Sequence, residues 1–300
     1  IYAYIKRVAE LQLGIQTVFC VASRQRCDKF NAQSASNIAL KFNLRGYGIN
    51  HTLGEKDFAA IRGPNCSVDT IVLGADVTHP PNNASPGTPS IAAVVGTVDK
   101  DFMHFPGSMR LQRSKKEEIV ELGDMVKERL IDFYHENDHL PRRVLFYRDG
   151  PMEKNPKSKD FNDIVFDDDT GLNTPFDLTY IIVGKRHNTR FYPTRDADCV
   201  RKRPNFQRKS ENVQPGLVVD QVITHPYSSD FYLQSHDAII GTGKSAHYFV
   251  LQNGMALTTA QLHSTTHDFC YAYARATKGV SYCAPAYYAD RLCDRARAYL

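Results

Sequence analysis

Two apolar segments that each end in an aspartate constrain this sequence most. Residues 70–76 read TIVLGAD and residues 143–150 read RVLFYRDG, so Asp76 and Asp149 terminate runs that are almost wholly apolar. Short apolar runs rich in β-branched residues predict buried strands. A carboxylate at the end of such a strand is costly unless it is paired or binds a metal. Either aspartate could instead cap a turn, and Asp-Gly is a common tight-turn pair.

The rest of the chain mixes further strands with amphipathic helices, which indicates an α/β or mixed-sheet fold. Strands are predicted at 15–21, 90–98, 178–183, 217–224, 231–234 and 247–251. Helices are predicted at 1–11, 32–42, 114–136, 257–275 and 285–300. Glycine and asparagine punctuate residues 46–69, so a domain boundary is expected near residue 60. A chain of 300 residues is long enough for two domains.

The aspartates suggest a metal-dependent phosphodiesterase if their strands share a sheet. Asp76 and Asp149 would then meet at one edge, where further acids could help hold two divalent ions about 4 Å apart. Asp290, in the predicted C-terminal helix, could join them or lie on the surface. The helix predicted from residue 114 offers another acid, although acids in a first turn also suit the helix dipole. The candidates there are Glu117, Glu118 and Glu121.

Basic residues concentrate in one segment, although the net charge of the chain is only +4. Residues 185–209 contain nine lysines and arginines interleaved with aromatic side chains. Basic side chains can neutralise phosphates and aromatic rings can stack on bases, so this segment suggests a nucleic-acid partner. A solvated charged loop explains the same pattern equally well. The nine are Lys185, Arg186, Arg190, Arg195, Arg201, Lys202, Arg203, Arg208 and Lys209.

Cysteine usage and hydropathy bear on the compartment. The seven cysteines are dispersed without a C-x-x-C pair, which argues against a disulfide framework or structural zinc and favours a reducing compartment. No apolar run reaches the length of about 18 residues that a transmembrane helix needs. The chain opens with Ile1 and lacks a signal-peptide pattern, so it is expected to be part of a longer protein.

Seven motifs, taken in order, resemble the landmarks of the PIWI domain of eukaryotic Argonautes. They are GADVTHP (74–80), PSIAAVVG (89–96), LFYRDG (145–150), GKRHNTR (184–190), THP (224–226), DFYLQSH (230–236) and APAYYAD (284–290). Residues 1–50, particularly YAYIKRV and SNIALKFNLRGYGIN, resemble the second half of the preceding MID domain. The resemblance implies a ribonuclease H-like PIWI domain at 61–300, preceded by the C-terminal part of a Rossmann-like MID domain at 1–60.

This resemblance implies a guide-RNA-directed, divalent-metal-dependent endoribonuclease of RNA silencing. Its four catalytic acids fall on Asp76, Glu117, Asp149 and Asp290, with Glu118 the alternative for the second. The three aspartates would hold two Mg²⁺ or Mn²⁺ ions, which prefer hard oxygen ligands. Water would attack the target RNA directly and leave 3′-hydroxyl and 5′-phosphate ends. Two alternatives are a cleavage-inactive guide-binding module that recruits partners and an unguided ribonuclease H-like nuclease.

The resemblance also implies binding sites for a small guide RNA. The pocket for the guide 5′-phosphate and first base falls on Tyr2, Lys6, Lys41, Arg45 and Arg295. The guide backbone would contact Lys185, Arg186, Arg190, Arg275 and Lys278. A glutamine that the family commonly has in the 5′-phosphate pocket should fall near Thr17–Val18 and is absent there, and residues 151–173 also depart from the family pattern.

The partners implied are a 5′-phosphorylated small guide RNA, a complementary target RNA and proteins of a silencing complex. No membrane partner is expected. Cysteine usage and the resemblance together favour the cytoplasm, with the nucleus as the alternative.

Overall fold

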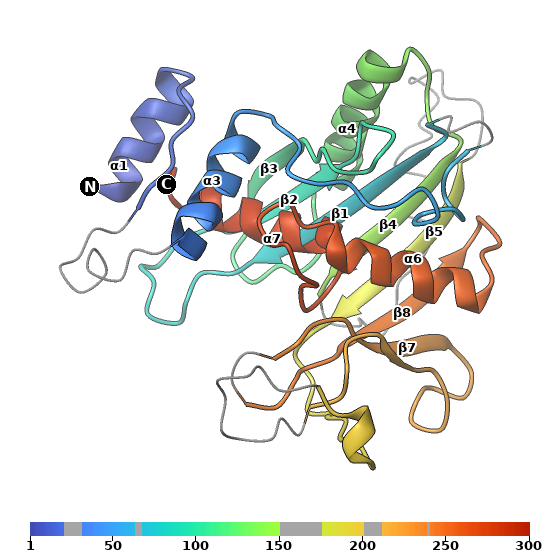
Figure 1. Cartoon of the computed structure of the whole chain (residues 1–300). Helices are drawn as coiled ribbons and strands as arrows, with labels where there is room; N and C mark the ends of the chain where they lie inside the picture. Colours follow the sequence, from blue (N-terminus) through green and yellow to red (C-terminus); the bar gives the residue numbers. More distant parts are fainter. Residues whose placement is uncertain (21–31, 64–67, 151–175, 201–211, 239–240) are drawn as a thin grey trace.

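The computed structural model describes residues 1–300 except 21–31, 64–67, 151–175, 201–211 and 239–240 (Figure 1). Its described part contains one eight-stranded mixed sheet in the order β3-β2-β1-β4-β5-β8-β7-β6. The strands are β1 (Thr70–Thr78), β2 (Ser90–Gly96), β3 (Gly107–Gln112), β4 (Arg143–Asp149), β5 (Asp177–Gly184), β6 (Leu217–Val219), β7 (Ser229–Gln234) and β8 (Ala246–Asn253). The predicted α/β class with a mixed sheet is therefore confirmed.

The centre of the sheet is parallel and its flanks are antiparallel. β1 pairs with β4 in parallel, and β4 pairs with β5 in the same way. The pair Ala75–Arg148 is the last in the β1–β4 register, so Asp76 and Asp149 follow it side by side. Both strands therefore carry their terminal carboxylates to the same edge of the sheet.

Helices cover both faces of this sheet, and the buried apolar residues that the structure describes form three clusters. Helix α4 (Leu122–Asn137) packs Met125, Leu130 and Phe133 against one face. Helices α6 (Thr259–Tyr271) and α7 (Ala284–Arg297) cover the other face (Figure 1). The capping box of α6 is made by Thr258 and Gln261, which satisfies backbone donors at its first turn. No described helix is both long and apolar enough to cross a membrane.

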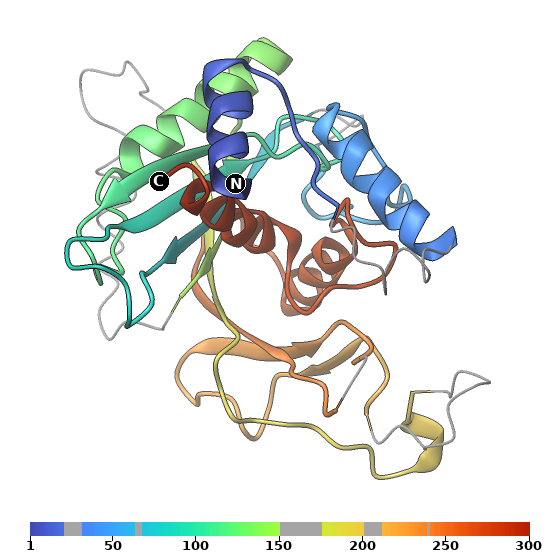
Figure 2. The ribbon, with the colours of Figure 1, turned by 90° about the vertical axis from the view of Figure 1, so that its left-hand side faces the viewer.

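The N-terminal segment lies beside the C-terminal end of α7 (Figure 2). Helix α1 (Tyr2–Lys6) continues into the π-helical η1 (Arg7–Gln12), and α3 (Ala32–Arg45) follows. The side chain of Glu10 reaches Arg295 of α7 across this contact. A short 3₁₀ helix, η4 (Asp196–Asp198), lies in the segment between β5 and β6.

Several predicted elements are wrong in detail. Residues 15–20 form no strand, and Ile15 is 57% exposed. The helix predicted at 1–11 does not bury its apolar residues: Ile5 is 39% exposed, and Lys6 is the buried side chain of α1 because it reaches the Glu10 carboxylate. The helix predicted from residue 114 begins only at Leu122. The predicted strand at 217–224 ends at Val219, and β3 was not predicted because its sequence lacks an apolar run.

Candidate functional site

Asp76 and Asp149 form the centre of a buried acidic site. Asp76 is only 8% exposed, and the Asp149 side chain is similarly enclosed. Asp76 lies near the end of β1 and Asp149 is the last residue of β4, and the residues before each of them in the strand lie mostly in the core. Burial raises the pKa of Asp76 to about 7, and the negative charges of Asp149 and Asp290 contribute to this increase. The charge of Lys185 acts in the opposite direction and lowers the pKa of Asp76.

Helix α7 supplies the third carboxylate, Asp290, from a position far along the chain. Close approach of this helix depends on Gly74 in β1, where an added Cβ would lie 2.1 Å from the backbone oxygen of Pro285. Only a residue without a side chain leaves room for the helix start at that point. The Asp290 carboxylate accepts a hydrogen bond from Tyr282 at 3.4 Å. The negative charge of Asp290 also helps to raise the pKa of Asp149, after the effect of burial.

Lys185 lies inside the acidic site. Its Nζ is 2.5 Å from Oδ2 of Asp149 and 3.8 Å from the centre of the Tyr282 ring. Burial raises the pKa of Asp149, while the charge and hydrogen bond of Lys185 lower it. The resemblance placed Lys185 on the guide backbone, whereas here its ammonium neutralises an acid at the end of β4.

The donor set suits Mg²⁺ or Mn²⁺, although the acids are not gathered around a single point. Within the described ranges, no three His, Cys, Asp or Glu side chains are arranged to hold a metal ion. After the effect of burial, the charges of Asp149 and Asp290 nevertheless help to raise the pKa of Asp76. Hard divalent cations prefer carboxylate oxygens, so the three aspartates fit the Mg²⁺ or Mn²⁺ ions that the family resemblance implies.

Glu117 is tied to the ends of the two aspartate strands. Its Oε1 lies 2.7 Å from Nε2 of His79, three residues after Asp76, and Ser90 contacts the other ring nitrogen. Its backbone oxygen accepts a hydrogen bond from Arg148, the residue before Asp149. Glu117 lies in an irregular segment before α4, so the first-turn interpretation of this acid does not apply.

Glu118 has different surroundings, since its carboxylate is 68% exposed and pairs with Lys116. Glu121 immediately precedes α4 and pairs with Arg110. Of the three candidate glutamates, Glu117 is therefore the one whose hydrogen bonds reach residues close to Asp76 and Asp149.

Divalent cations are expected to stabilise the protein in a pH-dependent way. Because the folded-state pKa of Asp76 is raised from 3.8 to about 7, the folded chain retains a proton that the unfolded chain loses in this window. The contribution of Asp76 to the free energy of unfolding therefore falls as pH rises from about 4 to about 7. A bound cation offsets this loss. We expect about 10 mM Mg²⁺ to raise the melting temperature by about 3 °C near pH 8 and much less near pH 5. Calorimetry with Asp149→Asn as the control tests this, and an equal shift in that variant would contradict it.

A second cluster gathers around the carboxylate of Glu10, which is almost completely buried. Glu10 accepts hydrogen bonds from Thr17 at 2.7 Å and from Arg295 at 3.0 Å, as well as from Tyr299 at 2.5 Å. Lys6, 2.5 Å from Glu10, is only 4% exposed. Burial alone would raise the pKa of Glu10, but these partners lower it well below its ordinary range. Glu10 is therefore an anion that holds the N-terminal segment against α7.

Arg45 and Arg275 extend this cluster and leave it with excess positive charge. Burial lowers the pKa of Arg45, and the charges of Arg295 and Arg275 lower it further. Gln16 accepts hydrogen bonds from both Arg45, at 3.3 Å, and Arg295, at 3.2 Å. A glutamine therefore does reach this cluster, one position before the range in which it was expected.

The remaining predicted guide residues are not all in this cluster. Tyr2 packs edge-on against Phe19, whose ring lies under Lys6. Lys41 lies one helical turn before Arg45 on α3, and Lys278 is exposed. Arg186 is exposed near Asp149, whose pKa it helps to lower, and Arg190 donates to nearby backbone oxygens. The basic residues at 201–209 and the whole divergent segment 151–173 lie outside the described residues.

Several residues of these sites had no distinctive sequence signal. Tyr282, Ser90 and Tyr299 are common residue types that reach the sites only through tertiary contacts. The Lys6–Glu10 pair has the i,i+4 spacing of a helical ion pair, which could have indicated it.

Comparison with known proteins gives consistent matches. A family model described as Piwi domain matches residues 1–300. Protein argonaute 5 of Arabidopsis thaliana is 36% identical over 324 aligned residues, which cover 100% of this chain and 31% of that protein. The chain thus spans about a third of the length of this curated relative.

Solved structures also match. The C-terminal lobe of a budding yeast Argonaute superposes with a TM-score of 0.86 and 32% identity, covering 100% of this chain and 60% of that one. Kluyveromyces polysporus Argonaute with a guide RNA superposes with a TM-score of 0.86 and 31% identity, covering 100% of this chain and 34% of that one. Drosophila Piwi superposes with a TM-score of 0.61 and 25% identity, covering 76% of this chain and 29% of that one.

Proposed function

Because this chain belongs to the Piwi domain family and corresponds to the C-terminal lobe of a eukaryotic Argonaute, we propose that it cleaves RNA opposite a bound guide. The reaction is a guide-RNA-directed, divalent-metal-dependent hydrolysis of the target strand. The observation that carries this proposal is that Asp76 and Asp149 lie side by side at one edge of the sheet, where the charge of Asp290 from α7 helps to raise the pKa of both. We assign residues 61–300 to a ribonuclease H-like PIWI domain and residues 1–60 to the end of a Rossmann-like MID domain.

The acids of this chain have separate roles in the proposed reaction. Asp76, Asp149 and Asp290 would hold two Mg²⁺ or Mn²⁺ ions, which supply electrostatic stabilisation of the phosphate as its charge increases. Glu117, which is hydrogen-bonded to His79, would be the fourth catalytic acid, on the side of β1. Lys185 orients the Asp149 carboxylate through its ion pair. Base pairing with the guide, rather than protein contacts to bases, selects the target bond.

The cation cluster at the N-terminal segment is the proposed site for the guide 5′-phosphate. Lys6 and Arg295 contact the one carboxylate of Glu10, and Arg45 and Arg275 add further positive charge nearby, so the charge of the cluster is only partly balanced. The relative solved with a guide RNA supports a guide ligand for this chain as well. Tyr2, exposed beside Phe19, would stack on the first base, and Lys41 would extend the phosphate contacts from α3. The guide backbone would follow the cations Arg186, Arg190 and Lys278.

Two alternative functions use the same fold differently. A silencing module that binds a guide and recruits proteins without cutting would need the cation cluster but not the acids. An unguided nuclease would need the acids but not the cluster. The presence of both sites in one chain favours guided cleavage. We place the protein in the cytoplasm, with proteins of a silencing complex as its further partners.

A cleavage assay tests this proposal. The protein, or the longer protein that contains it, is loaded with a 5′-phosphorylated guide and given a complementary labelled RNA with Mg²⁺ or with EDTA. We expect one cut at a position set by the guide, with 3′-hydroxyl and 5′-phosphate ends, and no cut in EDTA. Tight binding of guide and target without a cut would support the silencing module instead. Cutting without the guide would support the unguided nuclease.

Replacing either Glu117 or Glu118 by glutamine tests, in the same cleavage assay, which of these neighbouring acids takes part in the reaction. Glu117→Gln is expected to slow cleavage by about a hundredfold or more, because the charge near the ends of β1 and β4 is lost. Glu118→Gln is expected to leave the rate within about twofold, since this carboxylate is exposed to solvent. A larger loss in Glu118→Gln than in Glu117→Gln would reverse the assignment.

Removal of Arg45 is expected to weaken binding of the guide phosphate specifically. Arg45→Gln removes one cation while leaving the hydrogen bonds of Glu10 intact. Affinity for a 5′-phosphorylated guide should fall by about tenfold, because one charge-assisted contact is lost. Affinity for a 5′-hydroxyl guide should hardly change. Filter binding measures both, with the exposed Arg142→Gln at the opposite end of β4 as the matched control.

A further inference from the structure

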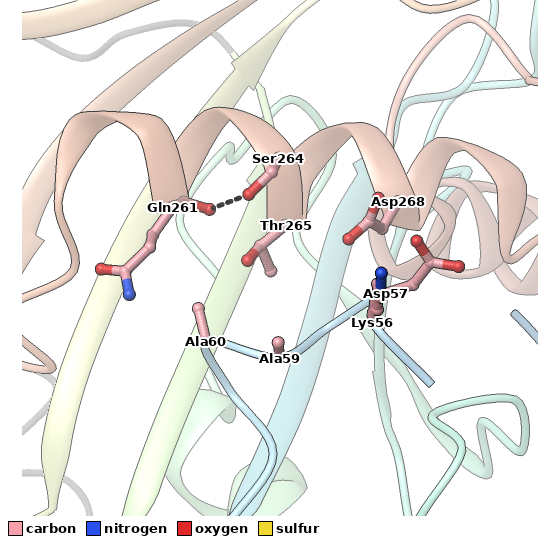
Figure 3. A pocket seen from close by; sticks show the side chains of 8 residues that line it. All are labelled: Lys56, Asp57, Ala59, Ala60, Gln261, Ser264, Thr265 and Asp268. Carbon is pink, nitrogen blue, oxygen red and sulfur yellow. Dashed lines mark hydrogen bonds between the residues drawn. The ribbon is translucent and has the colours of Figure 1, made fainter. Parts of the chain in front are cut away.

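A pocket of about 310 Å³ lies away from the sites described above, between residues 56–60 and helix α6 (Figure 3). The chain segment contributes Lys56, Asp57 and the methyl groups of Ala59 and Ala60. The helix contributes Thr265 and Asp268, whose side chains face the segment in this view. This volume is large enough to accept one long side chain.

The two carboxylates of the pocket are bonded to backbone amides. One oxygen of Asp268 accepts a hydrogen bond from the Phe58 backbone at 3.1 Å, and one oxygen of Asp57 accepts from Gly54 at 2.7 Å. Among the residues that the structure describes, neither acid has a lysine or arginine within 4.0 Å. Burial raises the pKa of Asp268, and the charge of Asp57 raises it further.

Thr265 is an independent sign that a ligand belongs here. The residue is only 2% exposed, yet it lines the pocket. Its hydroxyl makes no hydrogen bond to any described residue, whereas the neighbouring Ser264 donates to the Gln261 backbone (Figure 3). The Thr265 hydroxyl is therefore available to hydrogen-bond a polar group that enters the pocket.

We propose that this pocket binds an arginine side chain of a protein partner. A guanidinium carries five donors in a planar fork and is weakly hydrated, so it can serve two carboxylates and the Thr265 hydroxyl together. Its aliphatic stem would lie against Ala59 and Ala60. A nucleic-acid phosphate is disfavoured here because Asp57 and Asp268 would repel it. This inference does not depend on the proposed cleavage activity.

Lys56 has a distinct role in this arrangement. It is exposed at the rim and lines the pocket without forming an ion pair with either acid. Its ammonium adds positive charge at the entrance and competes with an incoming cation. Removing that charge should therefore strengthen binding of an arginine ligand.

Titration of the full chain with N-acetylarginine amide, followed by NMR of backbone amides, tests the proposal. We expect saturable shifts at Ala59, Ala60 and Thr265, and no such shifts with N-acetylcitrulline amide, which is neutral and nearly the same shape. Asp268→Asn keeps an acceptor for the Phe58 amide but should weaken binding by about tenfold or more, because a charge-assisted contact is lost. Lys56→Gln should tighten binding.

Two further variants keep the test decisive if Asp268→Asn does not fold. Asp57→Asn and Thr265→Val each remove one expected contact, and each should weaken binding of the arginine ligand. Equal binding of the citrulline and arginine amides would overturn the proposal. Saturable shifts confined to residues outside the pocket, or binding unchanged in all three variants, would overturn it as well.

Discussion

Replacing Asp149 by alanine is expected to reduce guide-directed cleavage by about a thousandfold or more, with guide binding retained. Asp149 is buried at the end of β4, is paired with Lys185, and lies in the electrostatic field of Asp290 and Asp76. Its loss removes a proposed cation ligand and leaves the Lys185 ammonium without its partner. Single-turnover cleavage with saturating guide and target measures the chemical step directly.

Asp290→Ala should reduce the rate of guide-directed cleavage by a similar factor if Asp290 is one of the four catalytic acids. The matched control is Asp294→Ala, one turn further along α7, whose exposed carboxylate pairs with Arg291. That variant should cleave within about twofold of the original rate. Cleavage that survives Asp290→Ala would remove Asp290 from the catalytic set and keep the enzyme. Loss of guide affinity in Asp149→Ala would point instead to a general structural effect.

Gly74→Ala is expected to destabilise the protein by about 3 kcal/mol or more, or to prevent folding. The new Cβ would lie 2.1 Å from the Pro285 oxygen and 2.2 Å from its carbonyl carbon. Backbone atoms at the start of a helix cannot move aside as a flexible side chain can, so α7 would have to leave the sheet. Chemical denaturation followed by circular dichroism measures the free energy of unfolding.

Gly184→Ala is the matched control for this effect, since Gly184 ends another strand of the same sheet. Its added Cβ would meet the nearest atom, the His247 oxygen, at 3.6 Å, which is an ordinary contact. The free energy of unfolding should therefore change by less than about 1 kcal/mol. Similar losses in the two variants would mean that strand geometry, rather than the approach of α7, requires glycine at position 74.

The two aspartate strands were predictable from the sequence because their information is local. Apolar runs of the right length identified β1 and β4, and parallel pairing then brings residues at corresponding strand ends together. The family resemblance likewise rests on ordered short motifs that can be recognised without any knowledge of contacts. Asp76 and Asp149 could thus be predicted to share one site from the sequence alone.

Prediction from the local sequence pattern failed where neighbouring charges or tertiary contacts outweigh the secondary-structure propensity of a segment. The apolar residues 15–20 suggested a strand, but the chain there supplies Gln16 and Thr17 to the Glu10 cluster instead. The periodicity after residue 114 suggested one long helix, but the segment before Leu122 is irregular and includes Lys115 at φ 63°. Glu117 could then reach His79, a contact that helical geometry alone would not predict.

By itself, the sequence determined the class of fold, the two strand-end carboxylates and the family. The tertiary structure decided which distant groups join them. It brought Asp290 close enough for its charge to act on Asp76, paired Lys185 with Asp149, and bonded Glu10 to Arg295 of α7. These contacts connect residues separated by tens to hundreds of positions, and they depend on how the strands pair and how the helices pack against the sheet. Periodicity records which face of an element is buried, but the partner of a buried charge is set only when the elements come together.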